Sequence, residues 1–540
     1  MSQWRVTEVD GVPAVWDDVP GPFTGALLVR VGHVDETLAR HGVTHMLEHL
    51  ALHGLDHPGE HSNGRVDATS MLLHATGTPD DVAAFLARAA AQLAAPPVAR
   101  LEDEKGILRA ERARQGPATL GEMFAWRWGT LGYGLETTPE YGLARMTADD
   151  IVAWSRTYAT RQNAVLWFTG PPPAGLRVAL PDGERRLPPD PYASPLPDFP
   201  AHFASAADVV LAHGLVRRST AGVALASVLR SRLVADLRVQ RAAAYSPDTS
   251  YRPLTADVAA LLALTDVVEG RAAEVSQRVV GILDELATVG GAPRPEEIDA
   301  HVTSVRQSAA SPGAAGGMVM STAWDLLHGG TPLTMDEVLD KLTRLTPEDV
   351  RAVAGELGET VLLQVPNGVP LPPWPAAPTS PAAPVRGRRF AAHDAAARLV
   401  IGDAGLTLMT ESSTQTVRRV QVAALAQWED GGRVLIGNDG VHVPLEPTVW
   451  RRGRRAVGLL DALVPASLTV PLGARPSDSI PRVPRWRRFR RPLGVAALGV
   501  VAIGALVALR ELDAPWMTAP YAVLFGAGLV RVWRGKPADW

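Results

Sequence analysis

The sequence predicts an α+β protein made of two similar domains, a small β-rich module and a hydrophobic C-terminal segment. Residues 1–170 mix short apolar runs, typical of strands, with longer amphipathic patterns, typical of helices. The same mixture returns in residues 201–365, and neither stretch shows the regular βαβ order of a doubly wound sheet. A length of 540 residues is also too great for one ordinary domain.

Strands and helices are expected at definite places in both domains. In the first domain, the apolar runs 26–31 and 164–168 predict strands, and the periodic stretches 80–93 and 148–158 predict helices. A proline-rich connector, 171–200, leads to the second domain. There we expect helices over 221–237 and 269–286 and a closing strand over 361–365.

A second proline-rich linker, 366–385, precedes a β-rich module over residues 386–470. Short apolar runs separated by Gly and Asp turns predict its strands, and 456–463 predicts a final helix. Strands closed by one helix resemble a pleckstrin-homology-like module in pattern only, because no motif identifies a ligand.

The C-terminal residues predict a membrane anchor. The segment 471–491 is basic, and 492–533 contains two uncharged runs, 492–509 and 514–530, separated by a short polar turn. Arginines precede the first run, arginine and lysine follow the second, and the turn between them is nearly neutral. The positive-inside rule therefore places both ends of this two-span hairpin in the cytoplasm. The alternative is a buried helical hairpin in a soluble domain.

Composition excludes several functions. A net charge of −4 argues against nucleic acid as the main partner. The absence of cysteine excludes disulfides, thiolate nucleophiles and cysteine-ligated zinc. The N-terminus has no basic start followed by an apolar core, so we expect no signal peptide. We therefore expect a protein at the cell membrane whose main domains lie in the cytoplasm.

The most informative motif is the H-x-x-E-H sequence of His45, Glu48 and His49. Histidines four residues apart on a helix point the same way and can share one metal ion. Glu48 adjoins the second histidine, within reach of a metal-bound water. The motif thus predicts metal-assisted hydrolysis.

A histidine-rich stripe is the competing interpretation of the same region. Histidine recurs every four residues from His41 to His61, which is also typical of a solvated helix face or an adventitious metal site. Pro58 and Gly59 interrupt any helix before His61, so the stripe cannot be continuous.

A catalytic zinc needs a third protein ligand and an open position for water. Glu104 and Glu111 are seven residues apart in a strongly helical stretch and therefore share a face. One can bind metal while the other orients a histidine. A solvated acidic face is the alternative.

These residues resemble the pitrilysin family of zinc metallopeptidases. The resemblance rests on residues 42–49, on the pair Glu104 and Glu111, and on 131–134 ahead of 146–150. It implies that His45, His49 and Glu111 bind zinc and that Glu48 is the general base. Glu104 would be the carboxylate that supports a ligand.

A second match lies in residues 237–246. This stretch is similar to an Arg…Ala-Tyr-Ser element of the family, and Arg238 and Tyr245 keep its seven-residue separation. The resemblance implies that these two side chains hold the substrate and stabilise the oxyanion. Ala242 departs from the glycine usual there.

Two further departures concern the first domain. The segment 67–70 is expected where the family has an Asn-Ala-x-Thr edge strand, and Asp67 and Ser70 break that pattern. The spacing from His49 to Glu111 is also shorter than is usual in the family.

Residues 1–365 amount to half of the family's closed chamber. A homodimer with two shared sites is the simplest assembly, and a heterodimer with another pitrilysin-type chain is the competing one. The expected function is a membrane-anchored zinc metalloendopeptidase that cleaves peptides or unfolded segments. The alternatives are a catalytically silent scaffold subunit and a histidine-rich metal-binding membrane protein.

Overall fold

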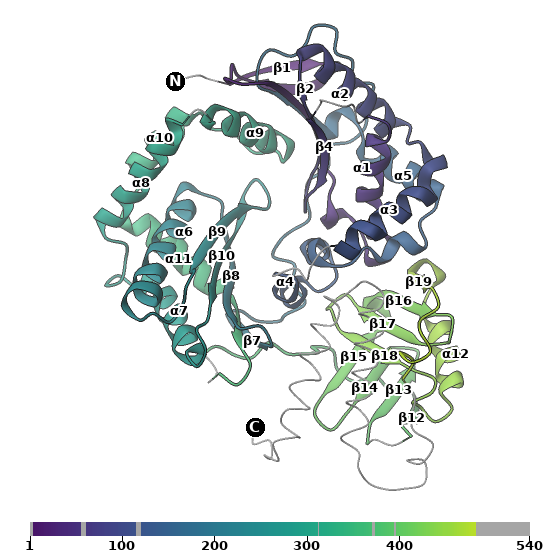
Figure 1. Ribbon diagram of the computed structural model, residues 1–540. Helices are drawn as coiled ribbons and strands as arrows, with labels where there is room; N and C mark the ends of the chain where they lie inside the picture. The colour runs from purple at the N-terminus through teal and green to yellow at the C-terminus, as the bar shows by residue number, and fades with distance from the viewer. Residues whose placement is uncertain are drawn as a thin grey trace.

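The computed structural model describes residues 4–55, 61–114, 120–311, 313–369, 373–393 and 396–481. Two α+β domains face each other across an open ring, and the β-rich module packs beside the first domain (Figure 1). Several sheets with helices on their outer sides make up this mixed architecture, as the sequence predicts.

The first domain is built on a six-stranded sheet of order β1-β2-β6-β3-β5-β4. All its neighbouring strands are antiparallel except β2 and β6, which are parallel. Its elements are β1 (Arg5–Val9), β2 (Val12–Trp16), β3 (Phe23–Val29), α1 (Val43–Leu52), β4 (His61–Val66), β5 (Met71–Gly77), α2 (Pro79–Ala94), α3 (Leu101–Arg114), α4 (Gly121–Trp128), α5 (Ala148–Tyr158) and β6 (Ala164–Phe168).

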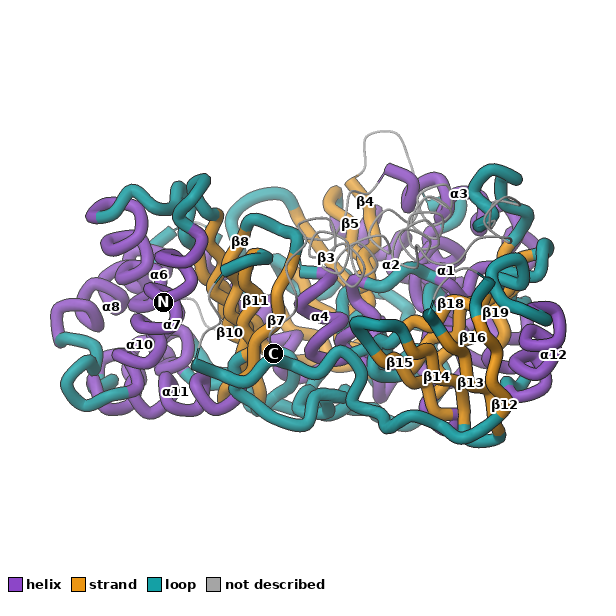
Figure 2. Tube along the Cα trace, turned by 90° about the horizontal axis from the view of Figure 1, so that it is seen from below, coloured by secondary structure: helices purple, strands orange, loops and turns teal. Residues whose placement is uncertain are grey.

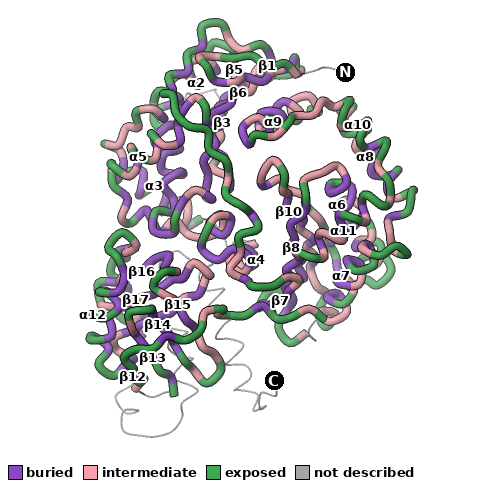
Figure 3. The backbone as a smooth tube through the Cα atoms, turned by 180° about the vertical axis from the view of Figure 1, so that it is seen from behind, coloured by how far each residue is buried: buried purple, intermediate pink, exposed green. Residues whose placement is uncertain are grey.

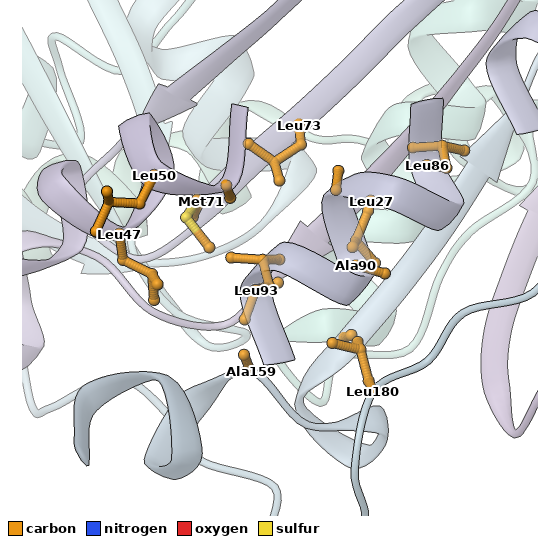
Figure 4. Packing of buried hydrophobic residues seen from close by; sticks show 14 of the residues in the cluster. Leu27, Leu47, Leu50, Met71, Leu73, Leu86, Ala90, Leu93, Ala159 and Leu180 are labelled. Carbon is orange, nitrogen blue, oxygen red and sulfur yellow. The ribbon is translucent and has the colours of Figure 1, made fainter. Parts of the chain in front are cut away.

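One face of this sheet is covered by α1, α2 and α5. Thr78 caps α2 with Pro79 at its first position, and Thr147 and Asp150 form a capping box at the start of α5. Leucine, valine and alanine from the helices fill the space against β3 and β5 (Figure 4). The helices and strands predicted at 80–93, 148–158 and 164–168 are confirmed.

The second domain repeats the plan with a five-stranded sheet of order β7-β11-β8-β10-β9. Its elements are β7 (Ala201–Ser205), β8 (Val209–Arg217), α6 (Thr220–Leu233), a π-helix (Val234–Gln240), β9 (Asp248–Pro253), β10 (Val258–Asp266), α7 (Ala272–Ala287), α8 (Pro295–Ala309), α9 (Ala314–Leu327), α10 (Met335–Thr343), α11 (Pro347–Thr360) and β11 (Leu362–Pro366). Helices α6, α7 and α11 share one core with this sheet, on the outer side of the ring (Figure 1).

Each domain also lends a helix to the other. From the second domain, α9 packs Val319, Ala323 and Leu327 onto the inner face of the first sheet. From the first domain, α4 packs Phe124 and Trp128 onto the inner face of the second sheet. This exchange fixes the two domains relative to one another.

The module consists of two four-stranded sheets, β12-β13-β14-β15 and β18-β17-β16-β19, which share a core with one helix (Figure 2). Its elements are β12 (Arg388–Ala391), β13 (Arg398–Gly402), β14 (Gly405–Met409), β15 (Thr414–Arg418), β16 (Val422–Trp428), β17 (Arg433–Gly437), β18 (His442–Leu445), α12 (Gly453–Leu463) and β19 (Thr469–Leu472).

The module continues past residue 470, the end expected from the sequence. Strand β19 pairs in parallel with β16. Buried Arg475 forms ion pairs with Asp430 and Glu446, at 2.6 Å in each case. Part of the segment expected to be a basic juxtamembrane stretch therefore belongs to the module's core.

The module is joined firmly to the first domain. Buried apolar residues of both form one cluster, with Leu135 and Tyr141 on one side and Trp428 and Ile436 on the other. Figure 3 shows β16 and β17 coloured mostly as buried, on the side of the module next to the first domain. Thr130 donates hydrogen bonds to two carbonyls of the β17–β18 turn, at 3.0 and 2.9 Å.

No single helix within the described ranges is long and apolar enough to cross a bilayer. One bent pair, Pro79–Ala94 with Val98–Arg112, passes that test by length and composition only. The predicted hairpin, 492–533, lies outside the described residues.

Candidate metal centre

Helix α1 carries the H-x-x-E-H motif, and a buried carboxylate holds its start. Gly42 precedes the helix with φ 99°, a conformation that favours glycine. Glu36 accepts hydrogen bonds from the backbone N–H groups of Gly42 and Thr44, at 2.9 and 2.8 Å. These bonds satisfy backbone N–H groups at the start of the helix, which have no hydrogen-bond acceptor within the helix itself. The apolar side of α1 then packs on the sheet, and His45 and His49 stand on the other side.

Three side chains converge as the resemblance implies. Glu111 Oε2 on α3 lies 3.8 Å from His45 Nε2 and 3.5 Å from His49 Nε2. Zinc–ligand bonds of about 2.0–2.1 Å at tetrahedral angles separate donor atoms by about 3.3 Å. The three groups therefore fit one zinc ion with little adjustment, and they form one of two ligand groups found among the described residues.

Both histidines are oriented by a carboxylate on the other ring nitrogen. Glu140 Oε1 lies 2.7 Å from His45 Nδ1, and Glu104 Oε2 lies 3.2 Å from His49 Nδ1. Carboxylates at Nδ1 favour a proton there and leave Nε2 free to bind a metal. Glu104 thus occupies the supporting position that the resemblance implies.

The ion pair of His45 with Glu140 is strong in the absence of metal. Burial alone lowers the pKa of His45, but the hydrogen bond and charge of Glu140, with Glu48 and Glu111 nearby, raise it to about 9. Burial raises the pKa of Glu140, but the bond to His45 outweighs it and lowers the value to about 2. A metal at Nε2 therefore competes with a proton.

Glu48 lies between the two histidines. Its Oε2 is 3.8 Å from Nε2 of both His45 and His49, and its side chain is buried. Burial raises the pKa of Glu48, against the opposing charges of the two histidines. A carboxylate with raised proton affinity next to the metal position can act as a general base.

A pocket of about 390 Å³ opens over these groups. Its described lining comes wholly from the first domain and is rich in charge: His33, His41, His45, Glu48, His49, Asn63, Gly64, Arg65, Val66, Leu108, Glu111, Arg112, Glu136, Thr138 and Glu140.

The edge strand beside the site is β4, which corrects the expectation for residues 67–70. Asp67 to Ser70 form the turn between β4 and β5, closed by a 2.8 Å bond from Asp67 N to Ser70 O. Asn63 and Gly64 of β4 line the pocket instead. A Cβ at Gly64 would lie 1.9 Å from Oε1 of Glu48, so the strand backbone runs directly against that carboxylate. The edge strand was expected too far along the chain, because β4 already begins at His61, soon after α1 ends at Leu52.

Arg238 and Tyr245 lie together, but away from this pocket. The Arg238 guanidinium sits 5.2 Å from the centre of the Tyr245 ring, and Tyr245 is 72% exposed. Neither is among the described residues that line the pocket. Within one chain, therefore, the structure brings the predicted metal ligands and the predicted base into one site, and it places the Arg238/Tyr245 pair outside that site.

His33, Glu36 and His41 are the second group with possible metal ligands. His41 Nδ1 lies 2.6 Å from Glu36, and His41 Nε2 lies 2.9 Å from the carbonyl of Thr138. Since Glu36 also accepts the amides at the start of α1, the lone pairs that a metal needs are largely engaged. This cluster supports α1.

Glu140 is the important site residue that the sequence did not indicate. It is 95 positions from His45, and no short spacing or periodicity links the two. The resemblance noted at 131–134 points to the right neighbourhood, because that segment leads into Glu136, Thr138 and Glu140.

Neither a protein-family model nor a curated protein matches this sequence. Solved structures do resemble the fold. A protease from Helicobacter pylori is 17% identical, with a TM-score of 0.56, over 68% of this chain and 100% of that one. The inactive domain of a peptidase M16 from Pseudomonas fluorescens is 14% identical, with a TM-score of 0.54, over 68% and 100%.

Pitrilysin matches with 14% identity and a TM-score of 0.50, and the match spans 68% of this chain but 45% of the pitrilysin chain. At such identities the likeness concerns the fold. The two α+β domains of this chain have the pitrilysin-like fold of M16 peptidase domains.

Proposed function

We propose that this chain is a zinc-dependent metalloendopeptidase that cleaves peptides or unfolded segments. The observation that carries the proposal is the arrangement of His45, His49 and Glu111. Glu111 Oε2 lies 3.8 Å from His45 Nε2 and 3.5 Å from His49 Nε2. The Glu48 carboxylate lies beside these atoms. When bound, zinc would polarise the scissile carbonyl and acidify the attacking water.

The chain's own residues account for the remaining tasks. Glu48 accepts the proton of the attacking water and later gives it to the leaving amine. Strand β4 is at the sheet edge, so its free backbone groups can pair with a substrate in extended conformation. This pairing favours unfolded segments over folded proteins.

The proposed site is completed by a second chain. The Arg238/Tyr245 pair lies outside its own chain's pocket, and the two domains match less than half of pitrilysin. A homodimer in which each chain supplies Arg238 and Tyr245 to its partner's zinc accounts for both facts, with a pitrilysin-type partner of different sequence as the alternative. These side chains would stabilise the oxyanion.

We also propose that residues 492–533 form a two-span hairpin that holds the catalytic domains at the cytoplasmic face of the cell membrane. The support is the sequence alone: two uncharged runs with basic flanks.

The test is cleavage of a mixed peptide library by the purified full chain, with the zinc content measured on the same sample. We expect about one zinc per chain, and cleavage that is lost in Glu48→Gln while the zinc remains. The matched control is Glu8→Gln, an exposed glutamate on β1, which should cleave like the wild type.

A silent scaffold subunit is the second candidate, because one structural neighbour is described as an inactive domain. It predicts no cleavage by the chain with or without Glu48. If the purified wild-type chain held no tightly bound zinc, the peptidase proposal would be contradicted.

A further inference from the structure

Six exposed arginines gather at one end of the β module. They belong to β12, β13 and the start of α12, and we call them the arginine face: Arg389, Arg398, Arg451, Arg452, Arg454 and Arg455. Ala391 of β12 contacts both other elements. It pairs with Arg398 of β13, and its carbonyl accepts a 2.9 Å hydrogen bond from the backbone N–H of Arg451, just before α12. The charges therefore lie on adjoining strands and the adjoining helix end.

The arginine face has no internal counter-charge among the described residues. None of its six guanidinium groups forms an ion pair or hydrogen bond with them, whereas Arg433 and Arg475 of the same module pair with Asp461, Asp430 and Glu446. Clustered like charges repel, so a concentrated unpaired patch indicates an anionic partner.

The chain leaves the module beside this face. Thr448, three positions before Arg451, donates a hydrogen bond to the carbonyl of Pro481, the last described residue. Six more arginines follow between 482 and 491, and then eighteen uncharged residues, 492–509. The path toward the proposed membrane hairpin thus begins next to the arginine face.

We propose that the arginine face lies on the membrane surface and binds the headgroups of anionic phospholipids. Basic residues next to a membrane segment are attracted to anionic lipid within about a Debye length of the surface. The module then fixes the orientation of the first domain above the bilayer, because the two share a buried interface. The inference rests on the proposed hairpin but not on the peptidase chemistry.

The test uses the absence of cysteine in the full chain. Ala391→Cys places one thiol inside the arginine face, and Ala207→Cys places one on an exposed position of the second domain. Each full-length variant is reconstituted in phosphatidylcholine vesicles with or without about 30 mol% phosphatidylglycerol, and labelling by a membrane-impermeant maleimide is timed.

We expect phosphatidylglycerol to slow labelling of the Ala391→Cys variant about tenfold or more, with no change in the Ala207→Cys variant, and high salt to remove the difference. Adding the triple substitution Arg451→Glu, Arg454→Glu and Arg455→Glu to the Ala391→Cys chain should abolish the effect while residues 482–491 stay unchanged. These side chains are exposed, so the fold should persist, which circular dichroism checks.

Equal labelling of the Ala391→Cys variant in both kinds of vesicle would overturn the proposal, as would slowing that persists after the triple substitution. Protection by added nucleic acid or acidic protein alone would assign the face to that partner instead. If the full chain did not float with the vesicles in a flotation assay, both the proposed hairpin and this proposal would be contradicted. Zinc content and cleavage would still test the peptidase independently.

Discussion

At the scale of single residues, the proposed metal centre depends on which nitrogen of each histidine is free to bind the ion. Glu104 and Glu140 both engage Nδ1. The i, i+4 spacing of His45 and His49 and the seven-residue spacing of Glu104 and Glu111 are local, so sequence alone could predict them. Glu140 reaches the site only through the tertiary path of residues 131–144, and no local pattern shows that path.

Glu140→Gln should therefore weaken metal binding without removing a ligand. The amide can still accept a hydrogen bond but gives up the negative charge that stabilises the His45 ring in its metal-binding orientation, and we expect about 10–100-fold lower zinc affinity. Competition with a chromophoric chelator measures this change. Glu102→Gln, on an exposed glutamate of α3, is the control. Unchanged affinity in Glu140→Gln would show that Glu140 does not position His45.

At the scale of elements, periodic and locally capped segments were predictable, and segments defined by packing were not. Helix α5 and strand β6 have the predicted bounds. Strand β16, with the sequence Val-Ala-Ala-Leu-Ala-Gln-Trp, shows no alternation because it is buried on both faces. The π-helix Val234–Gln240 continues α6 with a changed hydrogen-bond pattern that apolar periodicity cannot distinguish.

The docking of α9 depends on a buried neutral histidine. His328, at the end of α9, lies with Nε2 2.9 Å from Thr69 Oγ1 of the first domain. Burial lowers the pKa of His328 to about 3, and the nearby charges of Arg30 and Arg218 act in the same direction. Protonation therefore favours the unfolded state over the docked one.

Stability should fall as the pH drops from 6.5 toward 3, because only the unfolded chain takes up this proton in that window. Above pH 6.5 the residue contributes no pH dependence. His328→Gln keeps a polar, uncharged group. The free energy of unfolding of this variant should therefore change less with pH than that of the wild type, and the two slopes should differ by about 1.4 kcal/mol per pH unit at most. Denaturant titrations of both proteins across the window measure the difference. Parallel curves would contradict this role.

At the scale of the whole molecule, the two domains resemble half of a clamshell, and in the proposed homodimer a second copy supplies the other half. Co-expressed Glu48→Gln and Arg238→Ala chains provide a test. Each is inactive alone, but mixed dimers contain one site with Glu48 and Arg238 both intact, so about a quarter of wild-type activity should return.

The control is Glu48→Gln with the double variant Glu48→Gln/Arg238→Ala, which should stay inactive because no pairing restores Glu48. If the first mixture also stays inactive while dimers form, then each site uses residues of its own chain. A requirement for a different chain would instead indicate a heterodimer.

In the proposed peptidase, the exchange of α4 and α9 limits where a substrate can enter. Separating the two domains would strip a helix from each sheet and expose both inner faces to water. One chain is therefore a single rigid unit, and in the proposed dimer we expect the opening motion at the seam between the two chains. A covalent cross-link across that seam should stop turnover, whereas a cross-link between α4 and the second sheet should leave the rate of turnover unchanged.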